Sequence, residues 1–138
     1  ARWVHEGALW EQALVEATRS SEDASTLSAL ATLADRLLTE TTQRVDLADH
    51  LVSAATTDRH LLLAARLSGS HASRELTQKL WERKTAEALE GLGHVIRPDE
   101  AGKLAQLGAR PGVRRALIVA YRRTRDVRFM NELRELPR

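Results

Sequence analysis

The sequence predicts an all-α protein built from paired antiparallel helices. Three observations favour this fold class. Alanine, leucine, glutamate and arginine, which are strong helix formers, are abundant, whereas β-branched and aromatic residues are scarce. Apolar residues recur at helical spacing along most of the chain. Glycine, proline and capping residues divide these stretches into segments. The length of 138 residues corresponds to one ordinary domain, over residues 1–138.

The first two predicted helices span residues 3–18 and 24–40 and form a hairpin. On the first, Trp3 and Trp10 lie on one helical stripe, which predicts that both tryptophans belong to the core. Asp23 and the serine three residues before it resemble a capping box for the second helix. That helix carries a narrow apolar seam suited to one partner helix, made of Leu27, Leu30, Ala34 and Leu37. A sub-division at residue 42 would separate this hairpin from further helical hairpins over residues 43–138.

Three helices are predicted in the middle of the chain. The first covers residues 46–55. The second follows a cluster of N-cap residues, carries the apolar residues 61–67 and stops at Gly69. The third is long: it begins at a cap on Ser70, continues to about residue 89 and ends at the following glycines.

The C-terminal part of the chain predicts helices with clear starts. Pro98 and the two acids after it open a helix that stops at Gly108. Pro111 suits the first turn of the next helix, whose middle, residues 116–121, is the longest apolar run in the protein. Helical spacing continues beyond Asp126 to the end of the chain.

Two segments of the second half match each other at an offset of forty residues. Ala65 to Trp81 and Ala105 to Tyr121 each predict a short helix, a glycine-containing turn and a longer helix. A helical-hairpin unit of about forty residues is the period of a HEAT-like solenoid. The turn Arg-Pro-Gly-Val-Arg at residues 110–114 resembles the Pro-x-Val-Arg start of the second helix of a HEAT repeat. This resemblance implies a HEAT-like stack of helix pairs, and an irregular multi-helix bundle is the alternative.

Charge is unevenly distributed, although the net charge is only +2. Residues 1–60 hold ten acids and five bases, whereas residues 61–138 hold nine acids and sixteen bases. Many of these bases belong to the helix predicted after Pro111. A helical wheel places its core face around Val113 and a flank of guanidinium groups around Ile118. The candidate binding residues are Arg110, Arg114, Arg115, Arg122, Arg125 and Arg128.

This arginine-rich helix predicts an anionic partner. Guanidinium presents a rigid fork of donors that suits carboxylate and phosphate. We therefore expect a non-catalytic protein–protein interaction module that binds an acidic segment of its partner through this helix. Sequence-independent binding of nucleic-acid phosphates by the same residues is the alternative. A solvated face whose arginines pair with acids of the same fold would produce the same pattern. The oligomeric state is left open.

An enzymatic alternative rests on two loose arginine–histidine spacings. Arg44 precedes His50, and Arg66 precedes His71, at spacings that resemble the Arg-x(4–6)-His motif of HEPN ribonucleases, which are small helical bundles. The resemblance implies that the two side chains act on RNA phosphate at a dimer interface. Gly69 interrupts the helix between Arg66 and His71, whereas the family's motif usually lies on a helix. A non-catalytic protein is therefore the favoured expectation.

Several other classes are disfavoured. The chain has no cysteine, and its five histidines lack the spacing of a helical metal site, so each histidine is expected at or near the surface. No Walker loop and no Gly-x-Gly-x-x-Gly stretch is present, and no cofactor is expected. No apolar run is long enough to cross a bilayer, and no signal peptide is visible. These absences predict an intracellular protein, cytoplasmic or, in a eukaryote, nuclear.

Overall fold

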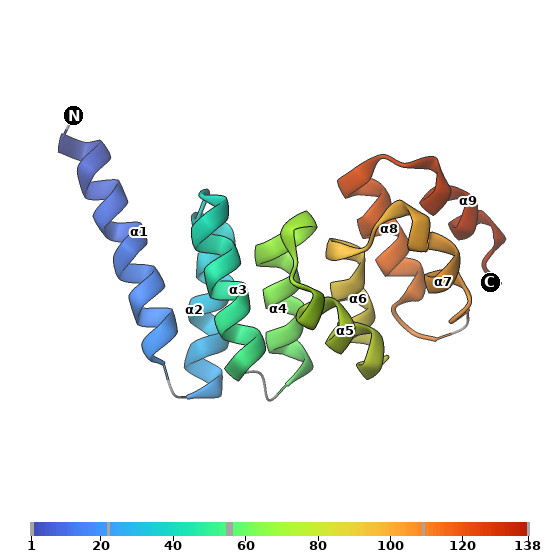
Figure 1. The fold of residues 1–138 in the computed structure, drawn as a ribbon, viewed down its shortest axis with the longest axis horizontal. Coiled ribbons are helices and arrows are strands. Elements are labelled where there is room, and N and C mark those ends of the chain that lie inside the picture. The colour runs from blue at the N-terminus through green and yellow to red at the C-terminus, as the bar shows by residue number, and fades with distance from the viewer. Residues whose placement is uncertain (1, 22, 55–56, 109, 138) are drawn as a thin grey trace.

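The helices are stacked along one axis, with the N-terminal helices at one end and the C-terminal helices at the other (Figure 1). The computed structural model describes residues 2–21, 23–54, 57–108 and 110–137, with side chains from Trp10 onward. These residues form nine α-helices, two 3₁₀ helices and no strand, which confirms the all-α prediction. The two ends of the chain lie at opposite ends of the stack.

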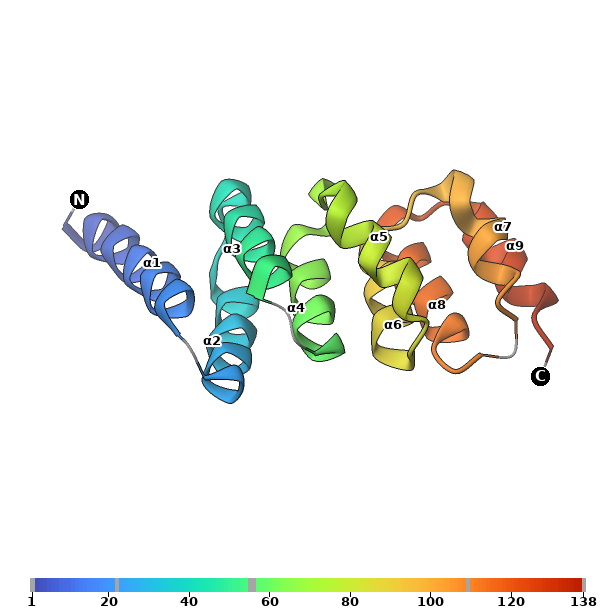
Figure 2. The ribbon, with the colours of Figure 1, turned by 60° about the horizontal axis from the view of Figure 1, so that its bottom comes forward.

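The helices form two rows, which Figure 2 shows from a second direction. One row contains α2 (Ala24–Leu37), α4 (Asp58–Ser68), α6 (Ala86–Val95) and α8 (Val113–Thr124). The other contains α1 (Arg2–Ser20), α3 (Thr41–Ala54), α5 (Arg74–Arg83) and α7 (Ala101–Ala105). Each helix of the first row packs against its neighbour in that row and against the helix that precedes it in the chain. Of the two predicted arrangements, the structure is therefore the stack of helix pairs.

The remaining elements connect and close the stack. The short helices η1 (Gly69–His71) and η2 (Pro98–Glu100) lie directly before α5 and α7. The last helix, α9 (Val127–Glu135), packs against α7 and α8 at the C-terminal end. None of the described helices is both long and apolar enough to span a bilayer.

One hydrophobic cluster continues through the stack from Leu14 to Phe129. Leucine and alanine make up most of it, as the scarcity of aromatic residues requires. Leu61, Leu89 and Leu117 are fully buried on α4, α6 and α8 and follow one another at intervals of 28 residues. The predicted offset of forty residues is therefore wrong, because it aligned α5 of one row with α8 of the other.

The start of α2 was predicted correctly, but its capping residue was not, because Ser20, the expected N-cap of the capping box, is the last residue of α1. Asp23 is the N-cap of α2, and its carboxylate accepts a hydrogen bond of 2.8 Å from the backbone N–H of Thr26. The hydroxyl of Thr57 caps α4 in the same way. Gly69 ends α4 with a positive φ of 52°, a conformation that glycine adopts without strain. By contrast, α3 begins at Thr41, five residues earlier than predicted.

The long helix predicted over residues 70–89 is wrong. Ser73, rather than Ser70, caps α5. The helix ends at Lys84, whose φ of 57° is left-handed, and the hydroxyl of Thr85 caps a new helix, α6. The glycines expected to end the long helix instead lie within α6.

The predicted core role of Trp10 is also wrong, since the residue is 49% exposed. Helix α1 is the first of the stack and packs against α2 and α3. It buries Leu14 and Thr18 on that side and leaves Trp10 at the surface. Leu37 of the predicted α2 seam is exposed as well, whereas Ala31 is buried. Trp3 lies outside the described side chains.

Candidate functional site: the arginines of α8

Helix α8 holds its arginines on a rigid support. Gly112 precedes the helix with a φ of 97°, and a Cβ at this position would lie 2.8 Å from the carbonyl oxygen of Ala86. Only glycine allows this close approach of the turn to α6. One side of α8 is buried in the stack through Val113, Ala116, Leu117 and Ala120. The other side carries the candidate binding residues.

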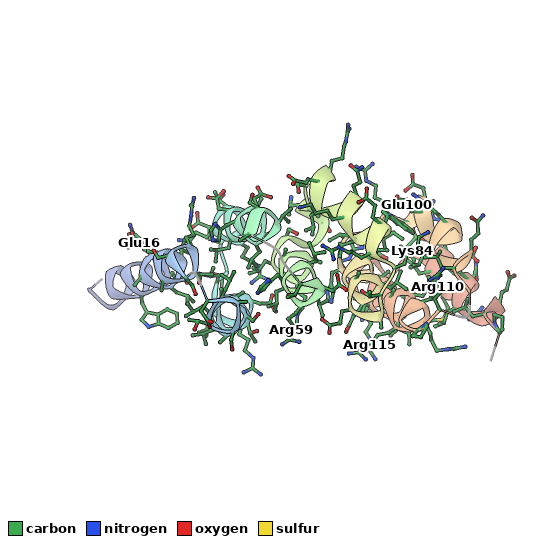
Figure 3. The ribbon with its side chains drawn as sticks, turned by 90° about the horizontal axis from the view of Figure 1, so that it is seen from below. Glu16, Arg59, Lys84, Glu100, Arg110 and Arg115 are labelled. Carbon is green, nitrogen blue, oxygen red and sulfur yellow. The ribbon has the colours of Figure 1, made fainter. Side chains whose placement is uncertain are left out.

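Arg114 and Arg122 form a line along the exposed flank of α8 around Ile118. They lie two helical turns apart, with half-buried Ile118 between them. Both side chains are exposed, and neither is paired with an acid among the residues that the structure describes. Arg110 is exposed in the turn before α8 and likewise has no described acidic partner. Figure 3 labels Arg110 and Arg115 on this part of the stack.

Arg115 adjoins this line but has an acidic neighbour. Its Nε donates a hydrogen bond of 2.6 Å to Oε1 of Glu90 on α6, and this bond raises the pKa of Arg115. The arginine side chain is still 72% exposed. In Figure 3 it points to the same side of the molecule as Arg59. Glu90 therefore neutralises part of the charge without covering the guanidinium group.

The other two candidate arginines lie where the chain leaves α8. Arg125 has a left-handed backbone conformation that ends α8, and its guanidinium carbon lies 5.7 Å from the ring centroid of Tyr121. Arg128 makes two hydrogen bonds of 3.0 Å from its guanidinium group to the carboxylate of Asp126, the N-cap of α9. This pairing lowers the pKa of Asp126 and raises that of Arg128. Arg125 is therefore exposed at the end of the line on α8, whereas Arg128 is paired beyond it.

Arg123 is an arginine of α8 whose role the sequence reasoning missed. It is half-buried and donates to the carbonyl oxygens of Gly93 and Ile96 and to the hydroxyl of Ser70. These bonds hold the C-terminal end of α6 against α8, and burial lowers the pKa of the guanidinium group. The sequence does contain one indication of this role: on the helical wheel, Arg123 lies beside Ala116 of the core face and away from Ile118.

The two ribonuclease-like pairs are not assembled in the structure. Arg44 and Arg66 both bind Asp35, at 2.6 and 3.0 Å, and their described hydrogen bonds include none to His50 or His71. Arg44 donates all its other bonds to main-chain carbonyls. His71 lies exposed in η1. Both arginines therefore have structural partners in this fold.

One described histidine, His60, differs from the placement at or near the surface that was predicted for each histidine. His60 is buried, with Nε2 3.2 Å from the carbonyl oxygen of Ala24, because α2 packs over the start of α4. His94 is half-buried at the end of α6, and burial together with the nearby cation of Arg66 lowers its pKa. In the described part of the chain, no group of histidines and acids is arranged to hold a metal ion.

Comparison with family models, curated proteins and solved structures found no match to this chain.

Proposed function

We propose that this protein is a helical interaction module that binds an acidic segment of a protein partner through α8. The observation that supports this proposal most directly is the pair Arg114 and Arg122. Both are exposed and lack a described acidic partner, although acids are almost as numerous as bases in the chain. Arg44 and Arg66, by contrast, are already occupied by Asp35.

The line of arginines suits carboxylates on a protein. Its two members project from one helix and lie about 12 Å apart, as two turns of an α-helix dictate. Carboxylates at comparable spacing on an acidic segment could contact both at once. Each contact would contribute modestly, because exposed ion pairs contribute about 0.2–1 kcal/mol. Arg115 would add a third contact if the incoming carboxylate shared it with Glu90.

A nucleic-acid backbone is a poorer match to this surface. Glu87 is exposed and Glu90 half-buried on α6, beside α8. A phosphate backbone is charged at every nucleotide and would meet both acids, whereas a peptide can place its carboxylates opposite the arginines alone. Single-stranded nucleic acid also favours sites with exposed aromatic rings. Tyr121, the aromatic residue of α8, is half-buried and lies near the guanidinium group of Arg125. We therefore place the acidic protein segment first.

The test is a titration of a labelled glutamate-rich peptide and of single-stranded RNA, each at low and near-physiological salt. We expect the peptide to bind more tightly than the RNA. The double variant Arg114→Glu and Arg122→Glu should weaken peptide binding about tenfold or more, because each substitution replaces an attraction by a repulsion. The helical circular dichroism should stay unchanged, since both side chains are exposed.

A matched control reverses two exposed arginines elsewhere in the same row of helices, Arg36 of α2 and Arg59 of α4. Its net charge equals that of the α8 variant, and we expect it to bind the peptide nearly as well as the wild type. Equal losses in the two variants would mean that overall charge, rather than α8, attracts the peptide. If RNA bound more tightly than the peptide, nucleic acid would replace the acidic segment as the proposed partner. If neither bound at low salt, both candidate functions would be overturned.

A further inference from the structure

A second surface, away from the arginine line of α8, has the features of a binding site. A groove of about 1200 Å³ lies between α5, the link from α6 to α7, and the end of α8. Its wall on the α5 side includes Arg74, Trp81 and Lys84, and the opposite wall includes Arg97 and Lys103. Arg114 and Arg122 do not line it. Figure 2 shows α5 and α7 on the same side of the stack, with the link between them.

Trp81 gives this groove an aromatic surface. The residue is half-buried, and the Nζ of Lys103 lies 4.2 Å from the centroid of its ring. The ammonium group of α7 therefore reaches across to an indole of α5. Ala72, Val95 and Pro98 extend the apolar part of the lining. An apolar side chain of a ligand could pack here, while a carboxylate beside it reached Lys103.

The charged residues of the groove favour an anionic ligand of mixed composition. Arg74, Lys84, Arg97 and Lys103 line the groove, and none is paired with a described acid. Arg123, also in the lining, is occupied by its bonds to α6 and Ser70. Three acids line the groove as well, namely Glu82, Asp99 and Glu100. A continuous phosphate backbone would meet these acids, whereas a peptide can place its carboxylates opposite the cations alone.

We propose that the groove between α5 and α7 binds an acidic peptide segment in which apolar and acidic residues alternate. An apolar side chain of the segment packs on Trp81, and the flanking carboxylates pair with Lys103 and with Arg74 or Lys84. This site uses residues separate from the arginine line, so the module holds two distinct binding surfaces. Either proposal can fail without the other.

The probe for this site is a peptide of alternating glutamate and leucine, followed by NMR of the indole N–H groups. The Trp81 signal, identified by its loss in Trp81→Phe, should shift and saturate as the peptide is added. Its indole nitrogen is buried without a described hydrogen-bond acceptor, so the signal reports changes in the surroundings of the ring rather than a direct hydrogen bond to the peptide. Lys103→Glu should weaken binding about tenfold, because it reverses the charge closest to the ring.

Two controls separate this site from the surface of α8. The double variant Arg114→Glu and Arg122→Glu should leave the Trp81 titration unchanged, and so should Arg134→Glu on the exposed side of α9. The proposal is overturned if the peptide leaves the Trp81 signal unmoved at low salt, or if Lys103→Glu binds as tightly as the wild type. If an all-glutamate peptide shifted the Trp81 signal equally, the proposed packing of an apolar side chain on Trp81 would be wrong. If single-stranded RNA bound more tightly than the peptide, the groove would be assigned to nucleic acid.

Discussion

Arginine has three roles in this chain, and the neighbours of each side chain decide which one it takes. Arg44 and Arg123 are half-buried and donate to carbonyl oxygens at helix C-terminal ends. Arg115 and Arg128 pair with acids at the surface. Arg114 and others project into solvent. The partial negative charge of a helix C-terminal end favours the first role, because a cation there meets otherwise unpaired carbonyls.

Arg44 provides the sharpest test at the residue scale. It makes five hydrogen bonds, which reach the C-terminal carbonyls of α2 and α4 and the carboxylate of Asp35. Lysine keeps the charge but replaces the fork of donors by one compact ammonium group. We expect Arg44→Lys to lower the free energy of unfolding by about 2–4 kcal/mol, because it leaves half-buried carbonyls unpaired. Urea denaturation measures this loss. Arg59→Lys, at an exposed site, should change stability by less than about 0.5 kcal/mol.

The sequence indicated which arginines of α8 are exposed. It did not indicate which carbonyl oxygens the half-buried Arg123 binds. A helical wheel places Arg114 and Arg122 on the flank around Ile118, because this depends only on the spacing within one helix. The role of Arg123 depends on carbonyls of α6, about thirty residues earlier, and no local pattern encodes their position. For the same reason, the spacing between Arg44 and His50 could not predict that Arg44 binds Asp35 and the carbonyl oxygens of α2 and α4.

At the scale of the helix, the capping residues in the sequence predicted where helices begin better than where a helix is interrupted. Thr57 belongs to a cluster of capping residues that the sequence identified, and its side chain binds a backbone N–H three positions away. The start of α2 was also predicted, although Asp23 rather than Ser20 caps it. The break between α5 and α6 falls on Lys84, a residue with no preference for its left-handed conformation. Tertiary packing of two separate helices stabilises this break, and Thr85 then caps α6.

Glycines within the helices yield a paired prediction. A Cβ on Gly93 would lie 2.6 Å from the carbonyl oxygen of Ala116, so alanine there would force α6 and α8 apart. A Cβ on Gly102 of α7 would meet nothing closer than 3.8 Å. We expect Gly93→Ala to destabilise the protein by about 1–3 kcal/mol through overpacking. Gly102→Ala should stabilise it by about 0.5–1 kcal/mol, because alanine favours the helix. The melting temperatures of the two variants measure this difference. A higher melting temperature for Gly93→Ala than for the wild type would contradict the close packing of α6 against α8.

At the scale of the whole molecule, each helix contacts mainly its neighbours in the stack. The sequence predicted paired helices correctly, since each helix carries its own apolar stripe. It did not predict the interval of 28 residues, because the leucines that mark it lie among many other leucines at helical spacing. A stack with contacts between neighbours should also respond to a mutation locally, since its stability is approximately a sum over adjacent units.

Phe129 tests this local response at the C-terminal end. It is fully buried, and among the described elements α9 packs mainly against α7, α8 and η2. Phe129→Leu should cost about 1–2 kcal/mol. Native-state hydrogen exchange should show faster exchange in α8, with α3 and α4 nearly unchanged. Leu47→Val in α3, also at a fully buried site, should produce the reverse pattern. If Phe129→Leu increased exchange in α3 and α4 as much as in α8, the chain would unfold as one cooperative unit despite its stacked architecture.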